Sequence, residues 1–67
     1  MIEFVYVVTG VCRDFDGETT ATIIGARKEQ KAAKELGASW VKDKKAEIKM
    51  LGVKWHASYK LDLVELR

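Results

Sequence analysis

The chain of 67 residues contains no proline, one cysteine and one histidine. A single cysteine, Cys12, excludes an internal disulfide, and together with His56 it supplies too few ligands for a tetrahedral zinc site, which needs four. A domain of this size buries only about 60% of the surface of its unfolded chain, so its core is small. With these two reinforcements excluded, oligomerisation is the stabilising device that the sequence leaves open, and a homodimer is one expectation.

The sequence also lacks a long apolar run, because no stretch approaches the roughly 18 residues of a membrane-spanning helix. Its first residues show neither the basic region nor the small-residue cleavage site of a secretory signal. A lone cysteine among apolar neighbours is typical of a reducing compartment. We therefore expect a soluble cytoplasmic protein with no membrane among its partners.

The first third of the chain predicts a β-hairpin. Residues 2–12 are rich in β-branched and aromatic side chains and are apolar on both faces, as a central strand is. Asp16-Gly17 is a strong signal for a two-residue hairpin loop, and residues 18–24 then form the second strand. This loop pairs Cys12 with Ala21. The resulting core-facing residues are Phe4, Tyr6, Val8, Cys12, Ala21 and Ile23.

Residues 27–51 predict an amphipathic helix with two distinct faces. One face is apolar and should pack on the sheet: Ala33, Leu36, Trp40, Ile48 and Leu51. The other carries six basic residues, which we call the lysine face: Arg27, Lys31, Lys34, Lys42, Lys45 and Lys49. Gly25 is a candidate N-cap and Gly52 a candidate C-cap. Gly37 either splits this helix or marks close packing against the sheet.

The end of the chain predicts another strand, since residues 53–63 alternate between apolar and polar side chains. Placed antiparallel to the first strand, it gives a three-stranded sheet in the order 2-1-3 with the helix on one face. Residues 1–67 then form one α+β domain of β-β-α-β order. A rival interpretation makes residues 46–50 and 53–57 a hairpin around Leu51-Gly52, which gives β-β-α-β-β.

No arrangement of side chains predicts catalysis. His56, Ser58 and Asp62 share one face of the last strand. Alternate residues of a strand stand about 6.6 Å apart, beyond the reach of a nucleophile and its base. We therefore expect a protein that is not an enzyme and that needs no cofactor or metal.

The sheet face opposite the helix is the first candidate binding surface. It would leave Val5, Val7, Val11 and Phe15 uncovered, bordered by Lys54, His56 and Lys60, and apolar patches with polar borders commonly mark interfaces. The sequence thus predicts a small protein-binding module, of regulator or inhibitor type, that docks on a larger acidic protein through this face or a sheet edge. The element order resembles small phage-encoded proteins that bind host enzymes, a likeness of order alone.

The lysine face is the second candidate surface. Residues 27–60 contain ten basic and four acidic residues, whereas residues 1–26 contain one basic and four acidic residues. Such a face is either a solvated surface or a binding site for phosphates. The alternative function is therefore nucleic-acid binding without sequence specificity. Trp40 and Trp55 both lie on predicted core faces, which leaves no aromatic platform for stacking bases.

Overall fold

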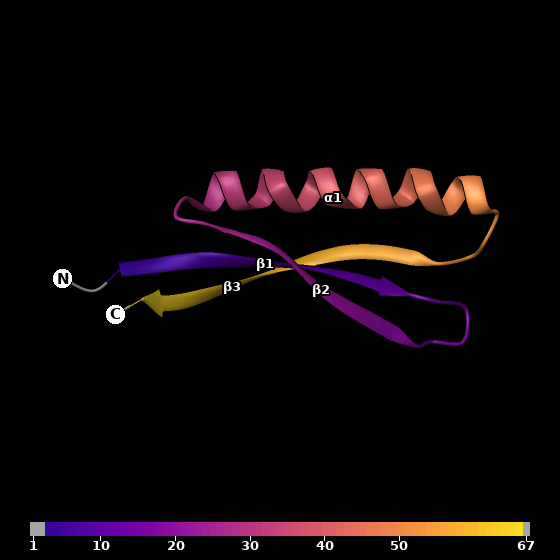
Figure 1. Cartoon of the computed structure of the whole chain (residues 1–67), viewed down its shortest axis with the longest axis horizontal. Coiled ribbons are helices and arrows are strands. Elements are labelled where there is room, and N and C mark those ends of the chain that lie inside the picture. The colour runs from indigo at the N-terminus through magenta and orange to yellow at the C-terminus, as the bar shows by residue number, and fades with distance from the viewer. Residues whose placement is uncertain (1–2, 67) are drawn as a thin grey trace.

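The structure, a computed structural model, describes residues 3–66. Its elements are β1 (Glu3–Arg13), β2 (Thr19–Arg27), α1 (Gln30–Leu51) and β3 (His56–Leu66). Strand β1 lies between the other two and runs antiparallel to both, in the order β2-β1-β3. Helix α1 lies along one face of this sheet (Figure 1). The predicted α+β fold and its β-β-α-β order are therefore confirmed.

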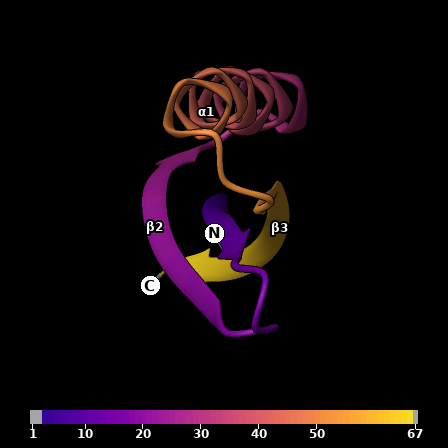
Figure 2. The same cartoon turned by 90° about the vertical axis from the view of Figure 1, so that its right-hand side faces the viewer.

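The molecule is long and flat, with principal extents of 48 × 20 × 11 Å. Figure 2, which looks along the helix, shows α1 over one side of the strongly twisted sheet. The buried apolar residues among those described are Val8, Ala33 and Ile48, and Val8 is the only large one that is fully buried. The radius of gyration is 13.6 Å, whereas a compact domain of this length has about 11 Å. The core is correspondingly thin.

The hairpin between β1 and β2 has a three-residue loop, so the predicted two-residue loop is wrong. The N–H of Asp14 donates to the carbonyl of Glu18 at 3.0 Å, which leaves residues 15–17 as the loop. A two-residue type I′ loop requires positive φ at both loop positions, whereas here Gly17 alone has it, at 85°. The extra loop residue shifts the register by one, so Cys12 pairs with Thr20 and not with Ala21.

This shift exchanges the two faces of β2 near the hairpin, because side chains alternate along a strand. Thr20 and Thr22 now lie on the same side as α1, around a hollow that Trp40 also lines. Ala21 and Ile23, predicted to be core, lie on the opposite side, and Ile23 is 72% exposed. A bulge between the pairs Thr9–Ile23 and Val8–Gly25 then absorbs one residue, Ile24.

Helix α1 begins at Gln30, three residues later than predicted. Glu29 is its N-cap residue, and Gly25 and Arg27 belong to β2. The helix ends at Leu51 and is capped by Gly52 with φ of 70°, as the glycine predicted. Because residues 46–50 are helical, the rival hairpin is wrong.

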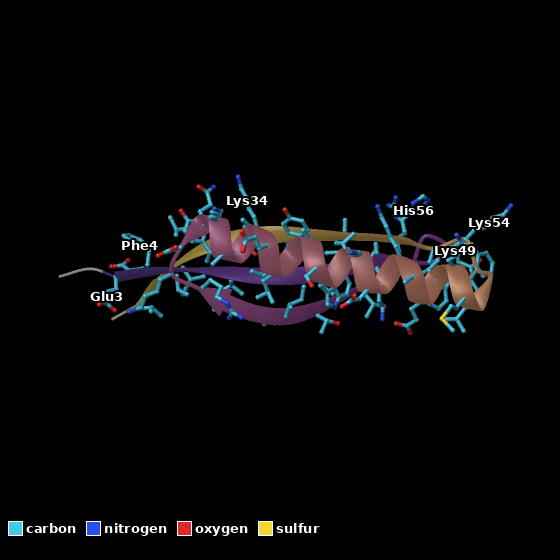
Figure 3. The ribbon with its side chains drawn as sticks, turned by 90° about the horizontal axis from the view of Figure 1, so that it is seen from above. Glu3, Phe4, Lys34, Lys49, Lys54 and His56 are labelled. Atoms are coloured by element: carbon cyan, nitrogen blue, oxygen red, sulfur yellow. The ribbon has the colours of Figure 1, made fainter. Side chains whose placement is uncertain are left out.

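The last strand begins at His56, and the segment 53–55 before it is not a strand. The predicted alternation still holds in the burial of side chains, which are half-buried at each odd position from Val53 to Leu61. Phe4 is 49% exposed, so its predicted place in the core is wrong, and Leu63, on the same side of the sheet, is 57% exposed. Phe4 lies where β1 extends beyond the first turn of α1 (Figure 3). At the other end, Leu51 is 60% exposed because the last helical turn extends past the strands.

Two glycines bring the helix close to the sheet. A Cβ atom at Gly10 would stand 2.7 Å from three atoms of the Trp40 indole, and one at Gly37 would overlap the Tyr59 ring. Contacts this short leave no room for any larger side chain. Of the two interpretations of Gly37, close packing against the sheet is therefore the correct one.

Candidate protein-docking surface

The sheet face opposite α1, which we call the open face, carries an apolar band across all three strands. On β1 it holds Val5, Val7 and Val11, which alternate with the helix-facing Val8 and Gly10. Their ladder partners extend the band onto the neighbouring strands. These partners are Ala21 and Ala26 on β2 and Val64 on β3. Ile23, opposite Thr9, is the most exposed large residue of the band at 72%, and Val64 and Leu66 are about 40% exposed.

One end of the open face is polar and basic. Arg13 and His56 are ladder partners at the end of β1 and the start of β3. With Thr19 and Ser58 they surround Val11 in a hollow of about 290 Å³. Guanidinium, imidazole and two hydroxyl groups can all donate hydrogen bonds. This hollow therefore offers a site for a carboxylate next to an apolar surface.

The structure brings together five of the seven residues predicted for protein binding. Val5, Val7, Val11, His56 and Lys60 all lie on the open face. The other two do not join them: Phe15 is in the hairpin loop, where it is 75% exposed, and Lys54 precedes β3.

Ile23 and Ala21 were missed as open-face residues because the predicted register was one residue out. In the hairpin loop only Gly17 has positive φ, which is the pattern of a three-residue loop and places both residues on the open face. Val64 and Leu66 were missed because the predicted strand stopped at residue 63. The alternation of polar and apolar residues is interrupted there, but the strand continues to Leu66.

The lysine face is solvent-exposed, but its members do not all lie on the helix. Lys31, Lys34, Lys42, Lys45 and Lys49 are exposed on α1, whereas Arg27 is on β2 and donates from Nη1 to the carbonyl of Ala26 at 2.7 Å. In the described part of the chain the one ion pair joins Lys44 to Glu47 at 3.6 Å. The five helix lysines are therefore not ion-paired in that part of the chain, and they form a positive surface.

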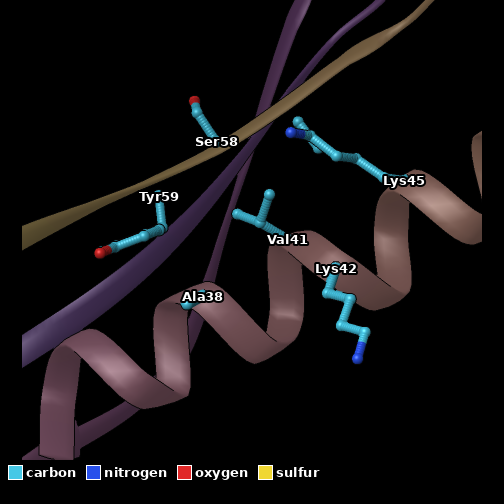
Figure 4. Close-up of a pocket in the computed structure, with 7 residues that line it drawn as sticks. Ala38, Val41, Lys42, Lys45, Ser58 and Tyr59 are labelled. Atoms are coloured by element: carbon cyan, nitrogen blue, oxygen red, sulfur yellow. The ribbon is translucent and has the colours of Figure 1, made fainter.

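Lys42 and Lys45 border a groove between α1 and the edge strand β3, with a volume of about 550 Å³. Its other lining residues are Ala38, Val41, Ala57, Ser58 and Tyr59. In Figure 4, Val41 points toward β3 and Lys45 extends toward the strand, whereas Lys42 points away from it. The groove is therefore apolar at its base, with a positive charge at one end.

Both tryptophans are half-buried on the other flank of the helix. They line a hollow of about 190 Å³ with Cys12, Thr20, Thr22 and Lys44, and the Lys44 ammonium lies 5.9 Å from the centre of a Trp40 ring. The indole N–H of Trp55 is buried without a hydrogen-bond partner. Neither tryptophan lines the groove that Lys42 and Lys45 border.

Within residues 3–66, no group of three or more metal-ligating side chains comes together. Across the same residues, no helix has the length and apolar character needed to cross a bilayer. Comparison with protein-family models, with curated proteins and with solved structures found no match. Residues 3–66 thus form a small α+β domain in which a helix covers one face of the sheet and no described element covers the other.

Proposed function

We propose that this protein is a non-catalytic cytoplasmic binding module that docks its open face on a larger protein and regulates or inhibits it. The observation that carries the proposal is the uncovered apolar band around Ile23, next to the basic hollow of Arg13 and His56. Contiguous apolar surface with a polar border is characteristic of protein interfaces. A small domain that acts by binding needs no reactive groups of its own.

The chemistry of the open face indicates what the partner presents. Val5, Val7 and Ile23 offer an apolar contact, and fully desolvated apolar contacts at the centre of an interface contribute most of the binding energy. Arg13 and His56 lie at one end, and Lys60 adds a further positive charge beside Thr9. The matching surface is an apolar patch with an Asp or Glu carboxylate at its margin, because that carboxylate would pair with the guanidinium.

Affinity capture with tagged protein from a lysate of the source cells, at low and at high salt and after nuclease treatment, tests this proposal. The informative variant is Ile23→Asp, because this side chain is exposed and its replacement leaves the core intact. We expect the wild type to retain one protein at high salt, and Ile23→Asp and Arg13→Glu to weaken its binding at least tenfold. Lys34→Glu, on the lysine face, is the control and should bind normally. Equal retention by Ile23→Asp and by the wild type would contradict docking through the open face.

The second candidate function is nucleic-acid binding through the five exposed helix lysines. It is supported by the absence of ion pairs to these lysines: within the described residues the one ion pair uses Lys44, which is not among them. Several lysines in contact with phosphates make the affinity fall steeply with salt. In the same capture experiment this function predicts that nucleic acid is retained at low salt, released at high salt, and lost in Lys34→Glu and Lys45→Glu but not in Ile23→Asp.

A further inference from the structure

Strand β3 is a long and regular free edge. Since β1 pairs on both of its sides, the two edges of the sheet are β2 and β3. Strand β2 is interrupted by a bulge, a feature that discourages pairing with another chain. Strand β3 pairs with β1 over all eleven residues without irregularity, and the chain has no proline to block its outer side. An edge of this kind is a template for a further strand.

The surface area shows how much of the molecule remains to be covered. The chain exposes 5305 Å² at a mass of 7.6 kDa, whereas a folded monomer of that mass exposes about 4,300 Å². The excess is about 1,000 Å², slightly more than the ~800 Å² that each partner buries in a standard protein interface. The single chain thus exposes more surface than is usual for its mass, by about the amount that one partner in a standard interface buries.

We infer that a second copy of the chain covers this edge, with the two β3 strands paired antiparallel about a two-fold axis at Leu61. Leu61 is the midpoint of His56–Leu66, so this register pairs all eleven residues. Each residue then faces the residue of the second copy that lies equally far from Leu61 in the opposite direction along the strand. A two-fold contact requires a self-complementary surface, and β3 meets that requirement on both of its faces.

On the open face, the register places Lys60 opposite Asp62 of the second copy, and Asp62 opposite the second Lys60. Both side chains are exposed and lie on the same face of β3, as their β1 partners Thr9 and Val7 show. Directly opposed residues of opposite charge stabilise an antiparallel pair, and like charges destabilise it. Sliding the register to centre on residue 60 or 62 opposes two lysines or two aspartates. The charges therefore select the register centred on Leu61.

On the helix face, the same register fills the groove between α1 and β3. Leu63 of the second copy, which is 57% exposed in the single chain, comes opposite Tyr59 beside Val41. Glu65 of the second copy comes opposite Ala57, at the end of the groove that Lys45 borders. In this register Leu63 of the second copy contacts the apolar base of the groove, and the carboxylate of its Glu65 lies near the Lys45 ammonium. Neither contact requires a change in the strands.

The product is a continuous six-stranded sheet with both helices on one face and two open faces side by side. This inference goes beyond the proposed docking function, since it concerns β3 and not the centre of the open face. The dimer presents two docking surfaces. If a partner has two matching sites, binding at one site raises the effective concentration of the second docking surface at the other. Formation of the dimer does not depend on a docking partner and can be tested without one.

Sedimentation velocity over a series of protein concentrations tests the inference. We expect a wild-type dimer, and a dissociation constant at least tenfold higher for Lys60→Glu and for Asp62→Lys, because each opposes like charges twice. The double variant with both substitutions should restore the dimer, because opposite charges face each other again. An equimolar mixture of the two single variants should form a heterodimer. Lys28 is exposed between β2 and α1, and Lys28→Glu is the control for the charge change of Lys60→Glu.

Circular dichroism of each variant establishes that it is folded, and because two different single variants are used, a folding defect in one leaves the other decisive. A wild type that sediments as a monomer at all concentrations would overturn the inference. So would a dimer that survives both Lys60→Glu and Asp62→Lys, because the contact would then lie elsewhere. Ile23→Asp should dimerise like the wild type, which separates a failure of docking from a failure of dimerisation.

Discussion

The indole of Trp40 lies against the backbone of Gly10, so closely that a Cβ atom at position 10 would be 2.7 Å from its Cε2, Cζ2 and Cη2 atoms. This contact seats the middle of α1 on the central strand of the sheet. The close approach is possible because Gly10 has no side chain, which leaves room for the large indole of Trp40. The register of the helix against the sheet therefore depends on this pair.

Gly10→Ala should lower the free energy of unfolding by about 1–3 kcal/mol, because the added methyl group forces the indole out of its position. Gly25→Ala is the matched control. Its Cβ would meet the flexible end of Leu36 at 3.1 Å, which can move aside, so a change within about 1 kcal/mol is expected. Urea denaturation of the two variants measures the difference. Equal stabilities of the two would show that Trp40 does not occupy this position.

Asp14 organises the hairpin loop with its side chain. Its Oδ1 atom accepts hydrogen bonds from the N–H of Asp16 at 3.0 Å and from the N–H of Glu18 at 2.9 Å. Asp14→Ala removes both bonds, and we expect a loss of about 1–2 kcal/mol in unfolding free energy. Asp14→Asn keeps the accepting oxygen and should lose less than half as much. Thermal unfolding ranks the two variants, and the reverse order would argue against these bonds.

The N-terminus of α1 leaves room for stabilisation. Glu29 is the N-cap residue but makes no side-chain capping hydrogen bond, and the first turn contains no acidic residue. Ser at this position accepts a bond from an unpaired N–H, so Glu29→Ser should raise the unfolding free energy by about 1 kcal/mol. Glu29→Ala tests whether removing the longer side chain is enough. If it stabilises as much as Glu29→Ser, capping is not the cause.

The sequence predicted the strand order and the C-terminal end of the helix because these follow from residue type. Strand β1 is apolar on both faces, as a central strand must be, and Gly52 takes the left-handed conformation that ends a helix. The binding face was predicted only in part. Val5, Val7 and Val11 follow from alternation along β1, which needs no knowledge of pairing.

What the sequence did not predict depended on contacts or on a single loop residue. Asp16-Gly17 is compatible with loops of two and of three residues, and the choice decides which face Ile23 occupies. The exposed position of Phe4 follows from how far β1 extends beyond α1, a length that no local sequence pattern predicts. Arg27 was placed on the helix because its neighbours favour helix, but pairing with Tyr6 keeps it in β2.

The position of Ile23 on the open face underlies the proposed docking surface, and the unfolding free energy of Ile23→Asp tests it most directly. Because this side chain is 72% exposed, we expect a loss of at most about 1 kcal/mol, which reflects β propensity alone. Ile48→Asp, at a position that is 8% exposed, should prevent stable folding, since it buries an unpaired carboxylate. If Ile23→Asp also unfolded the protein, Ile23 would belong to the core and the open face would not be the surface described above.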